Sequence, residues 1–266
     1  MAKMSVNQGL FLNFLRGFAG MEDIVITVSE EGYRASGTME RSYYVEKWVE
    51  YRDGESCLEE GSITIGQLEL FKGLAASCGT GILTITQNDD TIRVLSEGAD
   101  FTIPTIAEAN SQQGVEVVAD MVKLSSADNW DKFGEADIQF NSAYEADKFQ
   151  QLKNAGKAIQ TGALYSVEIQ QSDIHSTLLL TVVRDQIRFT VDLDAEEFSK
   201  DQTEENVILW FGKWLMDALK AMPGKGTVRV LGGADAPLII KHEAPDNEAW
   251  GTLCVIAPRQ ESGDNA

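Results

Sequence analysis

The chain has 266 residues, of which 43% are hydrophobic and 24% are charged, so it can bury a core and is not expected to be disordered. Its 42 acidic and 22 basic residues give a formal net charge of −20, which by itself argues against binding to nucleic acid, because affinity for phosphates comes from lysine and arginine. The three cysteines Cys57, Cys78 and Cys254 are odd in number and far apart, which argues against a disulfide framework or a zinc site.

No apolar run approaches the roughly 18 residues that a membrane-spanning helix needs. Residues 1–20 lack the long apolar core and the cleavage site of a secretory signal. We therefore expect an intracellular protein with no membrane partner.

Read in chain order, apolar runs bounded by turn residues predict antiparallel strands. These strands cover Ile24–Val28, Gly61–Ile65, Ile82–Gln87, Thr91–Leu95, Leu164–Ile169, Thr177–Val183, Gln186–Leu193, Thr227–Leu231, Leu238–His242 and Leu253–Ile256. Apolar residues at helical spacing predict four short helices between the strands. The helices cover Leu10–Phe18, Gln67–Ser77, Ala143–Lys157 and Trp210–Met222. This mixture predicts an α+β protein.

The order of elements repeats along the chain. The segment beginning at Gly61 reads strand, helix, glycine-rich turn and strand, and the segment beginning at Glu205 reads the same. The segments beginning at Gly9 and Ala143 both read short helix, strand and turn. We therefore expect two copies of one domain, each with two helices and antiparallel sheets.

Residues 107–135 lie between the two copies, with polar ends and an apolar middle at Val115–Leu124. One interpretation is a linker that contains a single edge strand. The other is a linker whose apolar middle lies over a groove used by partner proteins.

The charge is unevenly distributed. The four helices, taken as 8–18, 67–77, 143–157 and 210–222, hold seven basic and four acidic residues, which leaves 15 basic and 38 acidic residues elsewhere. Lys153 and Lys157, like Lys213 and Lys220, are spaced to share one exposed helical face. These faces are either ordinary solvated surfaces or parts of one surface that attracts a phosphate backbone.

No catalytic arrangement stands out. His175 begins a strand and His242 ends one, and both positions favour a surface or core role over catalysis. The segment Pro223–Thr227 lacks the glycine spacing and the Ser or Thr of a phosphate-binding loop, so it is interpreted as a turn. We expect no enzymatic activity, no cofactor and no metal.

Four segments carry a resemblance to a known family: FTIPTI at Phe101–Ile106, WFGKWLMDALKAM at 210–222, DAPLII at Asp235–Ile240 and the terminal CVIAPR. In this order, and together with the internal repeat, they resemble the PCNA-type DNA sliding clamps of archaea and eukaryotes. The resemblance covers almost the whole chain and is strongest from about residue 205 to 260. It places an N-terminal clamp domain at 1–106, a connecting linker at 107–135, a C-terminal clamp domain at 136–260 and a flexible tail at 261–266.

The resemblance implies a DNA clamp fold and a homotrimeric ring around duplex DNA, with the helices inside. Such a ring is a processivity factor that tethers DNA polymerase and other replication and DNA repair proteins, and partners would include a clamp loader and proteins with PCNA-interacting peptides. It also resolves the charge argument, because a topologically held DNA needs only weak, non-specific contacts. The DNA-facing residues would be Arg16, Lys72, Lys148, Lys153, Lys157, Lys213 and Lys220.

The family's ring closes by strand pairing between subunits, and the matching strands are about Gly98–Pro104 and Asp185–Leu193. The interface residues would be Phe101, Ile103, Ile187, Phe189 and Val191. Alternatively, these are two ordinary edge strands of a monomer.

Family partners insert a peptide beneath the linker, against the chain's terminal Ala-Pro. The pocket residues would be Met39, Met121, Leu124, Pro237, Val255, Ile256, Ala257 and Pro258. Pro258 cannot donate to a strand ladder, so the last strand ends before it and leaves backbone acceptors for another chain.

The alternative function is that of a clamp-like interaction protein that forms mixed rings or stays monomeric without loading on DNA. The resemblance implies a cytoplasmic location in a prokaryotic or virus-infected cell, or a nuclear one in a eukaryote, and a viral member of the family is compatible with the departures from its pattern.

Overall fold

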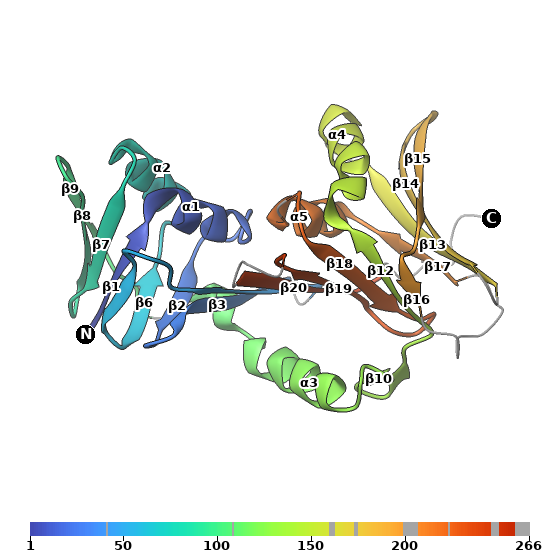
Figure 1. The fold of residues 1–266 in the computed structure, drawn as a ribbon, viewed down its shortest axis with the longest axis horizontal. Helices are drawn as coiled ribbons and strands as arrows, with labels where there is room; N and C mark the ends of the chain where they lie inside the picture. Colours follow the sequence, from blue (N-terminus) through green and yellow to red (C-terminus); the bar gives the residue numbers. More distant parts are fainter. Residues whose placement is uncertain are drawn as a thin grey trace. The chain divides into compact units, whose positions relative to one another are not determined.

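The computed structural model describes residues 1–40, 42–107, 109–159, 163–172, 175–198, 207–222, 224–245 and 250–258 (Figure 1). The chain divides into two compact units. The first consists of residues 1–116 and 246–252, and the second runs from 117 to 245 and from 253 on. The predicted tail at 261–266 lies outside the described residues.

The first unit contains two antiparallel sheets and two helices. Its elements are β1 (Ala2–Asn7), α1 (Gln8–Arg16), β2 (Ile24–Val28), β3 (Gly32–Met39), β4 (Tyr43–Glu50), β5 (Ser56–Glu59), β6 (Gly61–Ile65), α2 (Leu68–Ser77), β7 (Ile82–Gln87), β8 (Thr91–Leu95) and β9 (Asp100–Pro104). One sheet has the order β5-β1-β7-β8-β9, and the strands β4-β3-β2-β6 follow one another in the other. The two helices contact each other, and their Phe11, Phe14 and Phe71 pack with Tyr33 of β3 in one aromatic cluster.

The second unit is built from the same kinds of element, two antiparallel sheets and a pair of α-helices. Its elements are β12 (Phe140–Glu145), the 3-10 helix η2 (Ala146–Phe149), α4 (Gln150–Ile159), β13 (Leu164–Ser172), β14 (His175–Arg184), β15 (Ile187–Asp194), β16 (Glu197–Phe198), β17 (Val207–Phe211), α5 (Lys213–Ala221), β18 (Thr227–Gly232), β19 (Leu238–Glu243) and β20 (Trp250–Ile256). The first three residues of β20 are grouped with the first unit and the rest with the second. The strands follow the orders β16-β12-β18-β19-β20 and β15-β14-β13-β17. The α4 and α5 helices contact each other.

The two units repeat one order of elements. Strand β1 corresponds to β12, helix α1 to α4, the run β2 to β6 to the run β13 to β17, helix α2 to α5, and the run β7 to β9 to the run β18 to β20. The strand orders also correspond position by position. The internal duplication predicted from the sequence is therefore confirmed by the topology.

The structure contradicts one of the two interpretations of the linker, the one that contains an edge strand. Its apolar middle forms a helix, α3 (Val115–Ala127), between the 3-10 helix η1 (Asn110–Gln112) and a small hairpin of β10 (Lys132–Phe133) and β11 (Ala136–Asp137). The predicted edge strand is therefore wrong. Val115, Val118 and Val122 recur at helical spacing, and this period prevails over the strand preference of valine.

The start of the linker is held on the first unit by several hydrogen bonds. The buried carboxylate of Asp23 accepts bonds from the backbone N–H groups of Asn110 and Ser111, both at 2.9 Å. The hydroxyl of Thr38 donates to the carbonyl of Gln113 at 2.6 Å. This end of the linker is thus part of the folded unit.

Two predicted helices begin too early. Residues 143–145 belong to strand β12 and residues 146–149 to η2, so α4 starts only at Gln150. Residues 210 and 211 belong to β17, and α5 starts at Lys213. In both cases a buried strand precedes the helix in the chain with few residues between them. The apolar residues of that strand fit the helical spacing, so the predicted helix starts N-terminal to the observed one.

Candidate functional site

The helix pair of the first unit presents one clearly exposed basic residue. Arg16 is exposed, and its guanidinium donates to the side-chain oxygen of Asn13 at 2.8 Å, which leaves its charge uncompensated by that contact. Lys72 is only 18% exposed at its side chain and forms an ion pair with Glu69 one turn earlier. Of the two predicted DNA-facing residues in this unit, Arg16 therefore has the better access to an anion.

The helix pair of the second unit presents more basic groups. Lys157 on α4 is exposed. On α5, the ammonium of Lys213 lies 4.0 Å from the ring centroid of Trp214, and Lys220 lies 3.4 Å from Asp217. Lys148 is in η2 and pairs with Glu196 at 3.2 Å.

Lys153 is not placed as predicted. The spacing to Lys157 predicts that both lie on an exposed face, but Lys153 is buried, and its ammonium donates to the carbonyl of Met222 at 2.9 Å. Desolvation by burial, followed by the charge of Lys157, lowers its pKa. Lys153 is therefore a structural group that holds the end of α5, and the prediction that it faces DNA is wrong.

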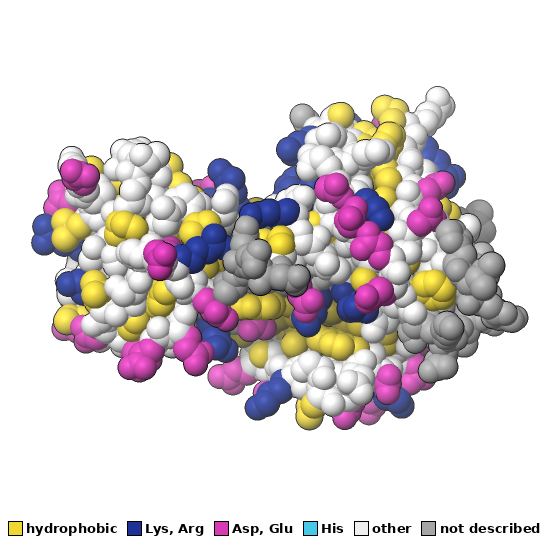
Figure 2. Space-filling model, in the orientation of Figure 1, with side chains coloured by type: hydrophobic (Ala, Val, Ile, Leu, Met, Phe, Trp, Pro, Cys, Tyr) yellow, Lys and Arg dark blue, Asp and Glu magenta, His cyan; other side chains and the backbone are white. Residues whose placement is uncertain are grey.

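The charge segregation remains on the observed helix boundaries. Helices α1, α2, α4 and α5 hold six basic residues against two acidic ones, a net +4 in a chain of net −20. Figure 2 shows dark-blue side chains over α1 and beside α4. The helix pair of each unit thus has a net positive charge, although Lys153 is buried and does not contribute to the exposed surface.

The two strands predicted to form subunit contacts are both edge strands. Strand β9 is the last strand of its sheet in the first unit, and β15 is the last of its sheet in the second. Ile103 and Val191 are buried, and the ring of Phe101 packs edge-on to Phe71 with centroids 5.6 Å apart, so these three residues serve their own cores. Ile187 and Phe189 are 57% and 37% exposed and form an apolar surface along β15.

The residues predicted to form the partner pocket differ in accessibility. Val255 and Ile256 in β20 are both buried, although neighbouring strand residues point to opposite faces. Open pocket walls at these two positions are therefore not observed. Ala257 is exposed and Pro258 is half-buried, directly after the strand ends at Ile256 as predicted.

The remaining pocket residues are spread over both units. Met39 is half-buried at the end of β3 in the first unit. In the second unit, Pro237 is half-buried just before β19, and Met121 and Leu124 on α3 are 37% and 68% exposed. Whether these side chains form one pocket stays a prediction.

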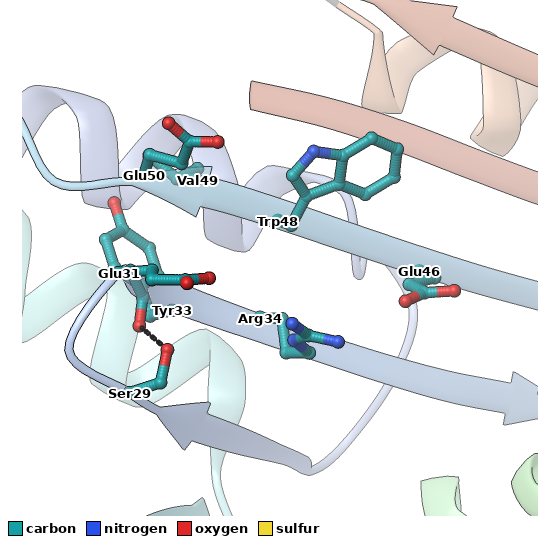
Figure 3. A pocket seen from close by; sticks show the side chains of 9 residues that line it. Ser29, Glu31, Tyr33, Arg34, Glu46, Trp48, Val49 and Glu50 are labelled. Carbon is teal, nitrogen blue, oxygen red and sulfur yellow. Dashed lines mark hydrogen bonds between the residues drawn. The ribbon is translucent and has the colours of Figure 1, made fainter. Parts of the chain in front are cut away.

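Sequence reasoning missed a hollow in the first unit. It has a volume of about 260 Å³ and lies over β3 and β4, where Arg34, Glu46, Trp48 and Glu50 line it together with the turn that carries Glu31 (Figure 3). The sequence pattern that could have indicated this hollow is Trp48 between Glu46 and Glu50. Residues two apart in a strand point to the same face, so these three side chains share one face.

The described residues offer no metal site, since nowhere among them do three or more His, Cys, Asp or Glu side chains gather in a way that could hold an ion. Within the same part of the chain, every helix is too short or too polar to cross a membrane.

His242 is fully buried, with its Nε2 atom 2.7 Å from the carbonyl of Lys225, as expected for a core histidine. The side chain of His175 lies outside the described residues.

The duplicated units, the paired helices and the strand orders define the DNA-clamp fold class. The particular fold is that of PCNA. The chain matches PCNA of A. fulgidus, solved with the C-terminal region of FEN-1, with a TM-score of 0.71 and 13% identity over 98% of this chain and 100% of that one.

Two further structures agree. PCNA of Thermococcus kodakaraensis gives a TM-score of 0.68 and 14% identity over 97% of this chain and 100% of that one. The PCNA2–PCNA3 complex of Sulfolobus tokodaii gives 0.69 and 16% over 97% and 99%. Neither a scan against protein-family models nor a search of curated proteins finds a match. The chain therefore has the PCNA-type clamp fold in a divergent sequence.

Proposed function

We propose that this chain is a DNA sliding clamp: a ring of identical subunits that encircles duplex DNA and tethers DNA polymerase and other replication and repair proteins, without chemistry of its own. The observation that carries the proposal is the PCNA fold over nearly the whole chain, in which the helix pair of each unit has a net positive charge while the chain as a whole is acidic. A weakly positive lining, in which acidic neighbours pair with Lys72, Lys148 and Lys220, suits a ring that must slide, because tight phosphate contacts would stop it.

The edge strands support ring closure. A free strand edge is an aggregation hazard, and closing β9 of one subunit onto β15 of the next would remove it at both ends. The exposed Ile187 and Phe189 would supply the apolar part of that contact. A trimer is the assembly we propose.

The first experiment is the solution mass by light scattering at low and high salt. A mass near three times 29.2 kDa supports the ring. The second is retention on circular duplex DNA in the presence of a clamp loader: protein that stays on the circle and leaves when the DNA is linearised is held topologically. A trimer that is retained equally on linear and circular DNA would contradict encirclement.

A second candidate is a subunit of a mixed ring, or a monomeric clamp-like protein that does not load. The likeness to a PCNA2–PCNA3 complex favours this candidate over an unrelated scaffold. A monomer at every salt concentration, converted to a larger species by another clamp subunit, would support it and exclude the homotrimer.

We also propose that partners bind through short peptides and that the protein acts where its host replicates DNA, in the cytoplasm of a prokaryotic or infected cell or in a eukaryotic nucleus. The peptide proposal rests on the similar PCNA that is solved with the C-terminal region of FEN-1. Binding of such a peptide, measured by calorimetry, tests it directly.

A further inference from the structure

The hollow over β3 and β4 lies entirely within the first unit and shares no residue with the predicted partner pocket. Its volume of about 260 Å³ is below the range of typical cofactor or drug-sized sites, and it suits a single long side chain. Its floor is backbone, because Gly32 has no side chain there and a Cβ atom at that position would collide with the carbonyl of Val49.

One wall is a fixed indole. Trp48 is half-buried, and its six-membered ring lies against the backbone of Gly251, where a Cβ atom would occupy the same space as the ring. The glycine therefore allows the ring to lie flat against the backbone, and the rest of the indole lines the hollow (Figure 3). The face of such a ring attracts cations.

The charges around the ring are mostly negative. Glu31, Glu46 and Glu50 line the hollow together with one cation, Arg34. Figure 3 shows Glu46 to one side of Arg34 and Trp48, and Glu31 and Glu50 to the other side. The indole thus stands between Glu46 on one side and Glu31 and Glu50 on the other, in a hollow lined by three carboxylates and one guanidinium.

The turn that carries Glu31 is held in place. The hydroxyl and the N–H group of Ser29 both donate to the carbonyl of Gly32, at 3.2 and 2.9 Å, and the N–H group of Tyr51 donates to the carbonyl of Glu31 at 3.1 Å. These bonds fix the backbone on both sides of the hollow, so the positions from which Glu31 and Glu50 extend are set before any ligand arrives.

The fold itself does not require this arrangement. The glycines before α2 and α5, Gly66 and Gly212, align the two units, and the strand registers then place Leu179 and Asp192 where the first unit has Arg34 and Trp48. The duplicate sheet thus stands without an indole at this position.

We propose that this hollow binds a cationic side chain, an arginine or a lysine, of a partner polypeptide. The ring face of Trp48 and the carboxylates of Glu31 and Glu50 both favour a cation. Arginine fits best because its guanidinium stacks on aromatic rings and forms bidentate hydrogen bonds with carboxylates. A partner anchored here would contact the clamp at a second place, independently of the peptide pocket and of DNA.

The test is an NMR titration of the tryptophan indole N–H resonances of the full chain, with the Trp48 signal assigned by Trp48→Phe. The probes are short capped peptides containing one arginine, one lysine or one citrulline, the last being a neutral copy of arginine. We expect saturable, millimolar movement of the Trp48 resonance with arginine, weaker movement with lysine, and none with citrulline.

Glu31→Gln with Glu50→Gln should weaken arginine-peptide binding roughly fivefold or more, because two ion pairs are lost. The matched control is Glu97→Gln with Glu116→Gln, which removes the same charge from two other exposed positions of the unit. An unmoved Trp48 resonance, an equal response to citrulline, or equal weakening by the control pair would overturn the proposal. A lysine response stronger than the arginine response would support the site and correct its preference.

Discussion

The ammonium of Lys153 on α4 donates a 2.9 Å hydrogen bond to the carbonyl of Met222, the residue that caps the C-terminus of α5. The last carbonyls of a helix lack partners within the helix and form the negative end of its dipole, so a cation there is favourable. The first unit uses the same device, because buried Lys47 reaches the carbonyl of Asn13 in the last turn of α1 at 3.1 Å. Each unit thus fastens one helix end with a buried lysine.

The first prediction concerns Lys153 and stability. Lys153→Met keeps the apolar stem but leaves the Met222 carbonyl without its donor, and we expect it to lower the free energy of unfolding by about 1 kcal/mol, since an orphaned buried acceptor costs roughly 1–3 kcal/mol and removing a buried charge offsets part of that. The exposed neighbour Lys157→Met is the control and should change stability by less than about 0.5 kcal/mol. Urea unfolding at matched protein concentration measures both, and equal effects would contradict a structural role for Lys153.

The second prediction is the pH dependence of that difference. Burial lowers the folded-state pKa of Lys153 below the roughly 10.4 of an unfolded chain. Below the folded-state pKa, the protein bears the whole free-energy cost of burying a charged lysine. Between the folded-state and the unfolded-state pKa, the folded protein releases this proton while the unfolded chain retains it, so the free energy of unfolding of the wild type rises with pH. The advantage of the wild type over Lys153→Met should grow between neutral pH and about pH 10. Subtracting the unfolding free energy of Lys153→Met from that of the wild type at each pH cancels the contributions of other titrating groups. A difference that stays constant or shrinks with rising pH would refute the lowered pKa of Lys153.

The third prediction concerns DNA. Lys157→Glu with Lys213→Glu should weaken binding to a short duplex and reduce the slope of log affinity against log salt by roughly 0.9 for each phosphate contact removed per site. The control is Lys123→Glu with Lys132→Glu, two exposed lysines of the linker region that lie outside the four helices. Fluorescence anisotropy in a salt series measures the slope. If both pairs reduce it equally, the helices are not the DNA-facing surface.

Much of the fold could be predicted because its strands alternate cleanly. The ranges predicted for β2, β6, β7 and β8 agree with the observed ones, since each is short, apolar on alternate residues and bounded by turn residues. Strands β3 and β4 escaped prediction because the small residues Ala35 and Gly37 and the charged Lys47 occupy buried positions and interrupt the apolar pattern. The clamp fold itself came from the resemblance, and the structural matches agree with it.

The site was harder to predict because spacing does not determine burial. Lys153 and Lys157 are one helical turn apart, yet one is buried against the end of α5 and the other is exposed, which depends on the neighbouring helix rather than on α4. Val255 and Ile256 were predicted to line a pocket, but strand β20 is covered at both positions. Both failures concern tertiary contacts that no local pattern reports.

The fourth prediction concerns self-association. Ile187→Lys with Phe189→Lys should lower the solution mass of any oligomer toward that of one chain, because two charges would have to be desolvated at an apolar strand edge. Ile208→Lys is the control, since Ile208 is 52% exposed on β17 at the opposite edge of the same sheet. Light scattering over a concentration series gives the masses. A double variant that assembles like the wild type would exclude β15 from the interface.

The fifth prediction separates the partner pocket from the core beside it. Ala257 and Pro258 are accessible, whereas Val255 and Ile256 are buried, so Ala257→Asp with Pro258→Asp should abolish partner-peptide binding while stability changes by less than about 0.5 kcal/mol. A charge at Ile256 would instead unfold the strand and test nothing about binding.

Leu124→Asp on the exposed face of α3 tests the linker helix. It should weaken binding of the same peptide if α3 covers the bound peptide, and leave binding unchanged if it does not. Calorimetry with one peptide on all three proteins decides: normal binding by the Ala257 and Pro258 variant would remove the pocket from this end of the chain, because its fold is intact and only its accessible residues have changed.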